Sequence, residues 1–200
     1  MTVDDRRVLG AVFAVALKGS ATQAAVARRL GVDDEYVRKA FKRLKDEGRL
    51  VASGRVLSLT EKGRRSIKVV FIGGGFEVIH PGHLHTIESA RKLGDVLVVA
   101  VATDSTIRRR KKREPVSTQE VRARLLSSLR QVDAALVGSE GDIYETLEKV
   151  RPDVVALGYD QYHRERGVAK EAAKRGIRVK VVRLDSPEPG LKTSALLAEY

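Results

Sequence analysis

The feature that most limits the fold is an alternation of strand-like and helix-like segments from residue 67 onward. Short apolar runs rich in Val and Ile are typical of buried strands, and they fall at residues 68–72, 95–102, 134–137, 154–157 and 177–182. Segments with a helical pattern separate them, at residues 84–93, 121–130, 143–150 and 169–174. Such alternation predicts a parallel, doubly wound sheet, so we expect an α/β domain over residues 67–200.

Residues 1–66 follow a different pattern, in which helices come first and two short strands follow. Helices are predicted at 4–18, 22–30 and 34–47, each followed by a glycine that can end it. Strands are predicted at 50–52 and 55–59, around a Ser-Gly turn. Three helices and a hairpin predict a small winged helix-turn-helix domain, joined to residue 67 by a short basic segment.

The run TQAAVARRLGVDDEYVRKAFKRLKDEGRLV, followed by LSLTEKGR, resembles the winged-helix DNA-binding domains of microbial regulators. The resemblance implies that the second helix of the motif reads DNA. The exposed face of that helix would present four cations, which are Arg38, Lys39, Lys42 and Arg43. Winged domains also serve in dimerisation or protein docking, so both roles stay open, and we expect a homodimer.

Composition excludes several classes of protein. The sequence contains no cysteine, which excludes disulfides, thiolate metal sites and cysteine nucleophiles. No apolar run approaches the length of a membrane span, and the first residues do not resemble a signal peptide, so we expect a cytoplasmic protein. The net charge is +12, which attracts polyanions, including both nucleotides and nucleic acids.

The loop after the first strand of the α/β domain carries the strongest chemical signal. It reads GGGFEVIHPGHLH. The glycines allow the backbone to approach phosphates closely, and Pro81 suits the first turn of a helix. His80 and His83 are three residues apart, so both rings can face one side near the positive end of that helix. This arrangement suits an anion whose charge grows in a transition state.

The same histidines allow another interpretation, in which His80, His83 and His85 bind zinc. A Gly beside a turn-forming Pro is a poor frame for three ligands, and the sequence offers no Cys and no second cluster. We therefore expect no protein-bound metal.

This segment resembles the HxGH nucleotidyltransferase superfamily, which has a Rossmann-like fold, over residues 67–194. Five further stretches match at the family's spacing, which are LGDVLVVAVATD, RRRKKREPV, RARLLSSLRQVD, RPDVVALGYD and GLKTSALL. The resemblance implies that His80 and His83 stabilise the five-coordinate α-phosphorus and the departing pyrophosphate, aided by Mg²⁺. It also implies that Arg130 faces the phosphates. The chain departs from the family's Gly-Thr-Phe-Asp, because Gly75 replaces the Thr and Glu77 replaces the Asp.

The remaining site assignments come from the same resemblance. Nucleotide contacts are expected from Gly74, Gly75, Phe76, Lys112, Arg113, Gly158, Asp160, Thr193 and Ser194, and acceptor contacts from Glu77, Asp104 and Tyr159. The basic run at residues 108–113 resembles a mobile loop that contacts the triphosphate. By default such a run is a solvated loop or a nucleic-acid patch.

The segment LVGSEGDIYETLEKVRPDVVALGYDQ is most similar to archaeal FAD synthases, which adenylylate FMN. We therefore expect ATP as the nucleotide and FMN as the acceptor. One alternative is transfer of CMP from CTP to an alcohol phosphate such as glycerol phosphate. Another is a DNA-binding regulator whose second domain only senses a nucleotide.

Overall fold

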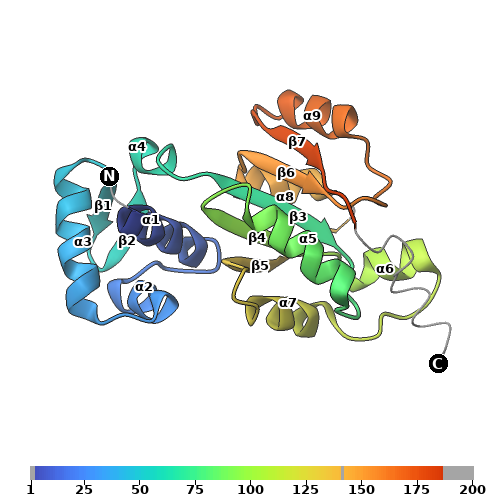
Figure 1. Ribbon diagram of the computed structural model, residues 1–200, viewed down its shortest axis with the longest axis horizontal. Helices are drawn as coiled ribbons and strands as arrows, with labels where there is room; N and C mark the ends of the chain where they lie inside the picture. Colours follow the sequence, from blue (N-terminus) through green and yellow to red (C-terminus); the bar gives the residue numbers. More distant parts are fainter. Residues whose placement is uncertain (1–2, 141, 187–200) are drawn as a thin grey trace. The chain divides into compact units, whose positions relative to one another are not determined.

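A computed structural model describes residues 3–140 and 142–186 and divides the chain into two compact units, Met1–Lys68 and Val69–Tyr200 (Figure 1). None of the helices in the described ranges combines the length and the apolar character that a membrane crossing requires.

The first unit contains four helices and a two-stranded antiparallel sheet among its described residues. The elements are α1 (Val3–Ala16), α2 (Gln23–Leu30), α3 (Asp34–Asp46), β1 (Leu50–Ser53), β2 (Val56–Leu59) and α4 (Glu61–Arg64). Side chains cap three of the helices, because Thr22 accepts a hydrogen bond from the amide of Ala25, Asp33 from the amide of Tyr36 and Thr60 from the amide of Gly63. Helix α4 forms in the segment that was expected to be a simple joint. The winged-helix identity of this unit stays a prediction.

The second unit is built on a five-stranded parallel sheet, as the sequence predicted. Its strands are β3 (Val69–Gly74), β4 (Val96–Val101), β5 (Ala134–Val137), β6 (Val154–Leu157) and β7 (Lys180–Arg183), in the spatial order β5-β4-β3-β6-β7. Its helices are α5 (Pro81–Arg91), α6 (Asp104–Lys111), α7 (Gln119–Ser127), α8 (Ile143–Val150) and α9 (Glu165–Lys174). The first strand of this unit, β3, is therefore the central one.

The central strands are buried because helices cover both faces of the sheet. Every residue of β4 is buried, and so are the first four of β3. Ile87 of α5 and Leu126 of α7 pack against alternate residues of β3 and β4 on one face. Helix α8 lies on the opposite face of the sheet (Figure 1). Burying each such side chain stabilises the fold by about 1.5–3 kcal/mol relative to leaving it exposed.

Two aspartates fix where the central strands begin. Asp133, just before β5, accepts a hydrogen bond from the amide of Leu97 at 2.8 Å. Asp153, just before β6, accepts one from the amide of Val69 at 2.7 Å. Each carboxylate ties the start of one strand to its neighbour, so the carboxyl ends of β3, β4 and β6 come together at one edge of the sheet.

The predicted mobile loop at residues 108–113 is wrong in its first part. Helix α6 continues through Lys111, and Lys112 ends it in the left-handed region with a φ of 56°. The helix is stabilised by Thr103, whose hydroxyl accepts a hydrogen bond from the amide of Thr106, and by Ile107, which is buried.

Candidate active site

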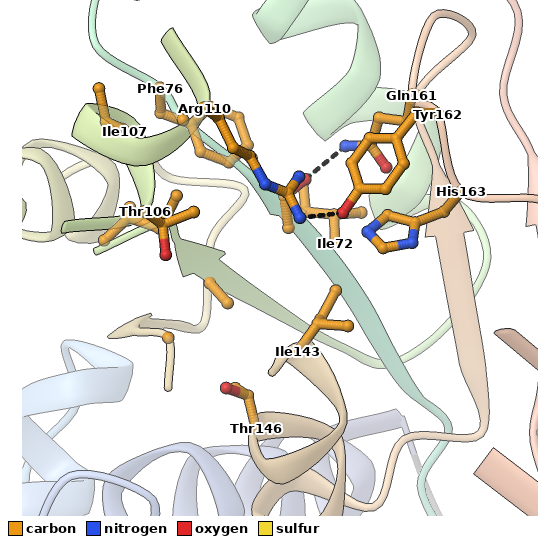
Figure 2. A pocket seen from close by; sticks show the side chains of 18 of the residues that line it. Ile72, Phe76, Thr106, Ile107, Arg110, Ile143, Thr146, Gln161, Tyr162 and His163 are labelled. Carbon is orange, nitrogen blue, oxygen red and sulfur yellow. Dashed lines mark hydrogen bonds between the residues drawn. The ribbon is translucent and has the colours of Figure 1, made fainter. Parts of the chain in front are cut away.

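A cavity of about 430 Å³ lies at the carboxyl ends of β3, β4 and β6. Connections leave β3 and β6 toward opposite faces of the sheet, and this reversal of direction is where open α/β sheets bind ligands. Around the same space, Figure 2 places Thr106 of α6, Ile143 and Thr146 of α8, and the segment that follows β6. The cavity is wide enough to reach from the end of β6 to Gly138, just after β5.

The glycines after β3 allow a tight turn into this cavity. A Cβ on Gly74 would lie 2.8 Å from the ring of Phe76, so a larger residue would displace that ring. Phe76 adopts a positive φ of 49° and is buried in the apolar core beside the cavity. Gly74, Gly75 and Phe76 all line the cavity, and their contact with phosphates stays a prediction.

His80 and His83 lie side by side at the start of α5. His80 is the residue before the first helical turn and Pro81 occupies that turn, which fits a residue without an amide hydrogen. The two imidazole rings are 3.9 Å apart between centroids, and the His83 ring also lies 5.1 Å from Phe76. The Nδ1 atoms of both histidines are buried and have no hydrogen-bond partner in the described part of the chain. Buried polar atoms are normally satisfied, so these two atoms are available to a ligand. His83 lines the cavity, whereas His80 stands next to His83 and is not part of the cavity wall formed by the described residues.

The environment keeps both imidazoles neutral near pH 7. Burial, together with the neighbouring His80, lowers the pKa of His83 to about 4. Burial also lowers the pKa of His80, although the Asp160 carboxylate opposes that shift. A neutral imidazole still offers one N–H donor to a phosphate oxygen.

Glu77 lies in the same loop but is fully paired. Its side chain is 0% exposed and forms ion pairs with Lys111 and with Arg113, the latter at 2.7 Å. The amide of Val116 also donates to it at 3.3 Å. Burial alone would raise the pKa of Glu77, but the hydrogen bonds from Arg113 and Lys111 outweigh it and lower the pKa to about 2. The structure thus places Glu77 and Arg113, predicted to contact acceptor and nucleotide, against each other.

The arginine that supports the loop after β3 is Arg122 of α7, which like Arg130 does not line the cavity. Arg130 is exposed beyond the end of the helix and is absent from the cavity wall formed by the described residues. Arg122 is 1% exposed and donates at 2.6 Å both to the carbonyl of Gly75 and to the carboxylate of Asp104. Asp104, predicted to contact the acceptor, is therefore engaged in holding α6 against the loop after β3.

The segment after β6 forms another wall of the cavity. Of the residues predicted to contact a ligand here, Gly158 and Asp160 line the cavity, whereas Tyr159 does not. Gln161 ties the segment to the sheet, because its side-chain amide donates to the carbonyl of Gly73 at 2.5 Å. The hydroxyl of Tyr162 accepts a hydrogen bond from Arg110 of α6, whose guanidinium lies 4.4 Å from the centre of the tyrosine ring (Figure 2).

The basic run at residues 108–113 was expected to contact the triphosphate, but the residues of it that line the cavity are not the two that were named as contacts. Arg109, Arg110 and Lys111 face the cavity from α6, while Lys112, the predicted contact, does not line it. Because the run was interpreted as a loop, the sequence analysis did not use helical spacing to decide which cations face the cavity. Thr193 and Ser194 lie outside the described residues. Within the described ranges, no group of three or more His, Asp or Glu side chains is arranged to hold a metal ion.

Comparison with known proteins gives a consistent result. Residues 71–198 match the cytidylyltransferase-like family. An FAD synthase of Aciduliprofundum boonei is 49% identical over 115 residues, covering 58% of this chain and 76% of the relative. An FAD synthase of Ferroglobus placidus is 44% identical over 122 residues, covering 61% and 79%. The crystal structure of a lipopolysaccharide core biosynthesis protein from Thermoplasma volcanium superimposes with a TM-score of 0.58 at 41% identity, covering 60% of this chain and 98% of that one.

Proposed function

This chain belongs to the cytidylyltransferase-like family, and we propose that it is an FAD synthase, which transfers AMP from ATP to the phosphate of FMN. The nucleotidyltransferase chemistry follows from the family. The choice of ATP and FMN is supported by relatives that are named FAD synthase and are 42–49% identical to this chain.

The observation that carries the proposal is the pair of adjacent, neutral histidines beside the cavity. Their buried Nδ1 atoms have no partner in the described residues, and the amino end of α5 adds a positive partial charge. Three cations of α6, which are Arg109, Arg110 and Lys111, face the same space. Together these groups suit a triphosphate better than a neutral ligand.

In the proposed reaction an oxygen of the FMN phosphate attacks the α-phosphorus of ATP. The bond between that phosphorus and the oxygen bridging to the β-phosphate breaks, and pyrophosphate leaves with the electron pair. The FMN phosphate is already ionised, so the step needs no general base. The histidines donate hydrogen bonds to the phosphoryl oxygens as charge grows on them, and the cations of α6 stabilise the leaving pyrophosphate.

A divalent cation such as Mg²⁺ would supply additional charge neutralisation when bound. The described residues do not fit a protein-bound ion, since they contain no suitable ligand cluster and the buried Glu77 carboxylate is paired with two cations. The ion would therefore arrive on the oxygens of the triphosphate itself.

The direct test is to incubate the purified full chain with FMN, Mg²⁺ and each nucleoside triphosphate. We expect FAD and pyrophosphate to form with ATP. Pyrophosphate release with CTP and glycerol phosphate, without FAD formation from ATP, would move the chain to the cytidylyltransferases. Nucleotide binding without any transfer would favour a nucleotide-sensing regulator.

For residues 1–66 we propose a second role, in which α3 contacts the phosphates of DNA. Arg38 and Lys39 are 67% and 73% exposed, and their ion pairs with Glu35 are at the surface. Arg43 is less available, because it pairs with the buried Asp5.

Gel-shift titrations with the full chain should show binding that weakens steeply with salt, and the double variant Lys39→Gln with Lys42→Gln should reduce the salt slope. The matched control is Lys170→Gln with Lys174→Gln in the second unit. A complex absent even at low salt would leave docking or homodimerisation as the role of this unit.

A further inference from the structure

Arg183, at the end of β7, makes more hydrogen bonds than its position on an edge strand requires. Its Nη1 atom donates to the carbonyls of Gly158, Gln161 and Tyr159, at 2.8, 3.1 and 3.4 Å. Its Nη2 atom donates to the carbonyl of His163 at 2.5 Å. Its Nε atom donates to Glu165 at 2.5 Å. All three nitrogens of one guanidinium are therefore engaged, four times by backbone carbonyls of a single segment.

These carbonyls belong to residues 158–163, which we call the β6 loop. Five of its six residues line the cavity, which are Gly158, Asp160, Gln161, Tyr162 and His163. Arg183 does not line the cavity, so it lies behind the β6 loop rather than inside the site. Gln161 fixes the same loop to β3 through the carbonyl of Gly73.

Because Arg183 binds carbonyl groups on one side of the β6 loop, it also determines which amide groups the loop directs toward the opposite side. In a trans peptide the carbonyl and the amide hydrogen point in opposite directions. Collecting the carbonyls of Tyr159 and Gln161 on one side therefore turns the amides of the following residues, Asp160 and Tyr162, the other way. A purine ring nitrogen accepts hydrogen bonds of the kind that such amides donate.

We propose that Arg183 is a positioning residue that sets the conformation of the β6 loop for recognition of the ATP base. This role rests on the proposed function, because it requires that the β6 loop contacts the base of ATP. It depends on the planar, forked geometry of the guanidinium, which lysine cannot reproduce. Glu165 supports it by holding the Nε atom of Arg183.

The test compares Arg183→Lys with Arg178→Lys, an exposed arginine on the segment before β7 that serves as the matched control. ATP binding to the full chain is measured by calorimetry without FMN. We expect the Kd for ATP to rise about tenfold in Arg183→Lys and to stay unchanged in the control. Turnover at saturating ATP should change far less than KM, because the reacting phosphates lie at the histidines.

Two further measurements separate positioning from general stability. Hydrogen exchange should accelerate at the amides of 159–163 in Arg183→Lys and stay unchanged in the other strands. Glu165→Gln, which alters an exposed partner, should raise the Kd for ATP in the same direction by less. An ATP affinity within about twofold of the unmodified chain in both variants would overturn the role. Because binding is measured without acceptor, a failure to form FAD would overturn the proposed activity and not the role of Arg183.

Discussion

The loop that follows β3 contains two kinds of buried polar group, and the contrast between them is instructive. At its beginning, the Glu77 carboxylate is fully buried and is satisfied by Lys111, Arg113 and the amide of Val116. At its end, the Nδ1 atoms of His80 and His83 are buried without partners in the described residues. The Glu77 end is complete without a ligand, whereas the histidine end is not.

The difference indicates that the two ends serve separate purposes. A satisfied buried charge stabilises the arrangement of the segments that meet there, here the loop and the end of α6. An unsatisfied buried atom costs stability unless a ligand satisfies it, and such costs are concentrated at functional sites. We therefore expect substitutions at the histidine end to impair turnover and those at Glu77 to impair stability.

The largest effect is expected at the histidines. His80→Ala or His83→Ala should each reduce the turnover of FAD formation by about 10²-fold or more, because a donor to the transition state is lost. The Tm should change little, since neither Nδ1 atom makes a bond that folding depends on. Steady-state assays and thermal unfolding check both parts. Unchanged turnover in both variants would contradict the assignment of the site.

Glu77→Gln should produce the opposite pattern. Removing one member of a buried ion pair is costly, but Lys111 and Arg113 are 39% and 35% exposed, which reduces the cost to about 1–2 kcal/mol. Urea unfolding measures the loss, with Glu114→Gln as control because its ion pair with Arg108 lies at the surface. A turnover defect as large as that of the histidine variants, without a loss of stability, would erase the contrast.

The two ends should also lose stability in different pH windows. The folded-state pKa of His83 is lowered from 6.5 to about 4, so the unfolded chain binds its proton first and stability falls as the pH drops through that range. For Glu77 the pKa is lowered from 4.5 to about 2, so its contribution is present above pH 4.5 and is lost as the pH falls toward 2. The free energy of unfolding should be measured as a function of pH. Compared with the unmodified chain, it should vary less between pH 6.5 and about 4 in His83→Asn, and less between pH 4.5 and about 2 in Glu77→Gln. Identical profiles in both variants would indicate that the shifts have another source.

The smallest effect concerns salt. Arg109 and Arg110 line the cavity, and neither forms an ion pair with a carboxylate of the described residues. Arg109→Gln should therefore raise the KM for ATP by a few-fold, about 1 kcal/mol. The rise should be greatest at low ionic strength, because added salt already screens the attraction in the unmodified chain. Kinetics at two salt concentrations test this, with Arg151→Gln as the control, because Arg151 directly follows α8 and does not line the cavity. Equal salt dependence in both variants would remove Arg109 from the triphosphate site.

The sheet was predictable because its signal is local. Runs such as 95–102 are apolar throughout, and that pattern is compatible with a strand buried on both faces. Helix α6 was not predictable in the same way. Consecutive cations at 108–111 repel one another at helical spacing, and the contacts that offset this repulsion come from Glu114 and Glu77.

The same distinction between local sequence signals and contacts distant in sequence applies to the candidate site. The histidines and glycines could be identified because their spacing within one loop carries the chemistry. The choice between Arg122 and Arg130 could not, since both lie in the predicted helical segment 121–130 and differ in what surrounds them. Arg122 is selected by the carbonyl of Gly75 and the carboxylate of Asp104, which are 47 and 18 positions away.

The strand order has a consequence for how the molecule matures. The central strand β3 pairs with β4, which is close in sequence, and with β6, which is distant in sequence. The hydrogen bond between Val69 and Asp153 spans 84 positions. Contacts so distant in sequence form late, because closing a long loop costs entropy before any pairing repays it. The cavity is bounded by the ends of both β3 and β6, so a chain released early from the ribosome, or trapped with only β3, β4 and β5 paired, has no complete binding pocket. The rate at which a refolding chain regains nucleotide binding should therefore report the rate at which β6 pairs with β3.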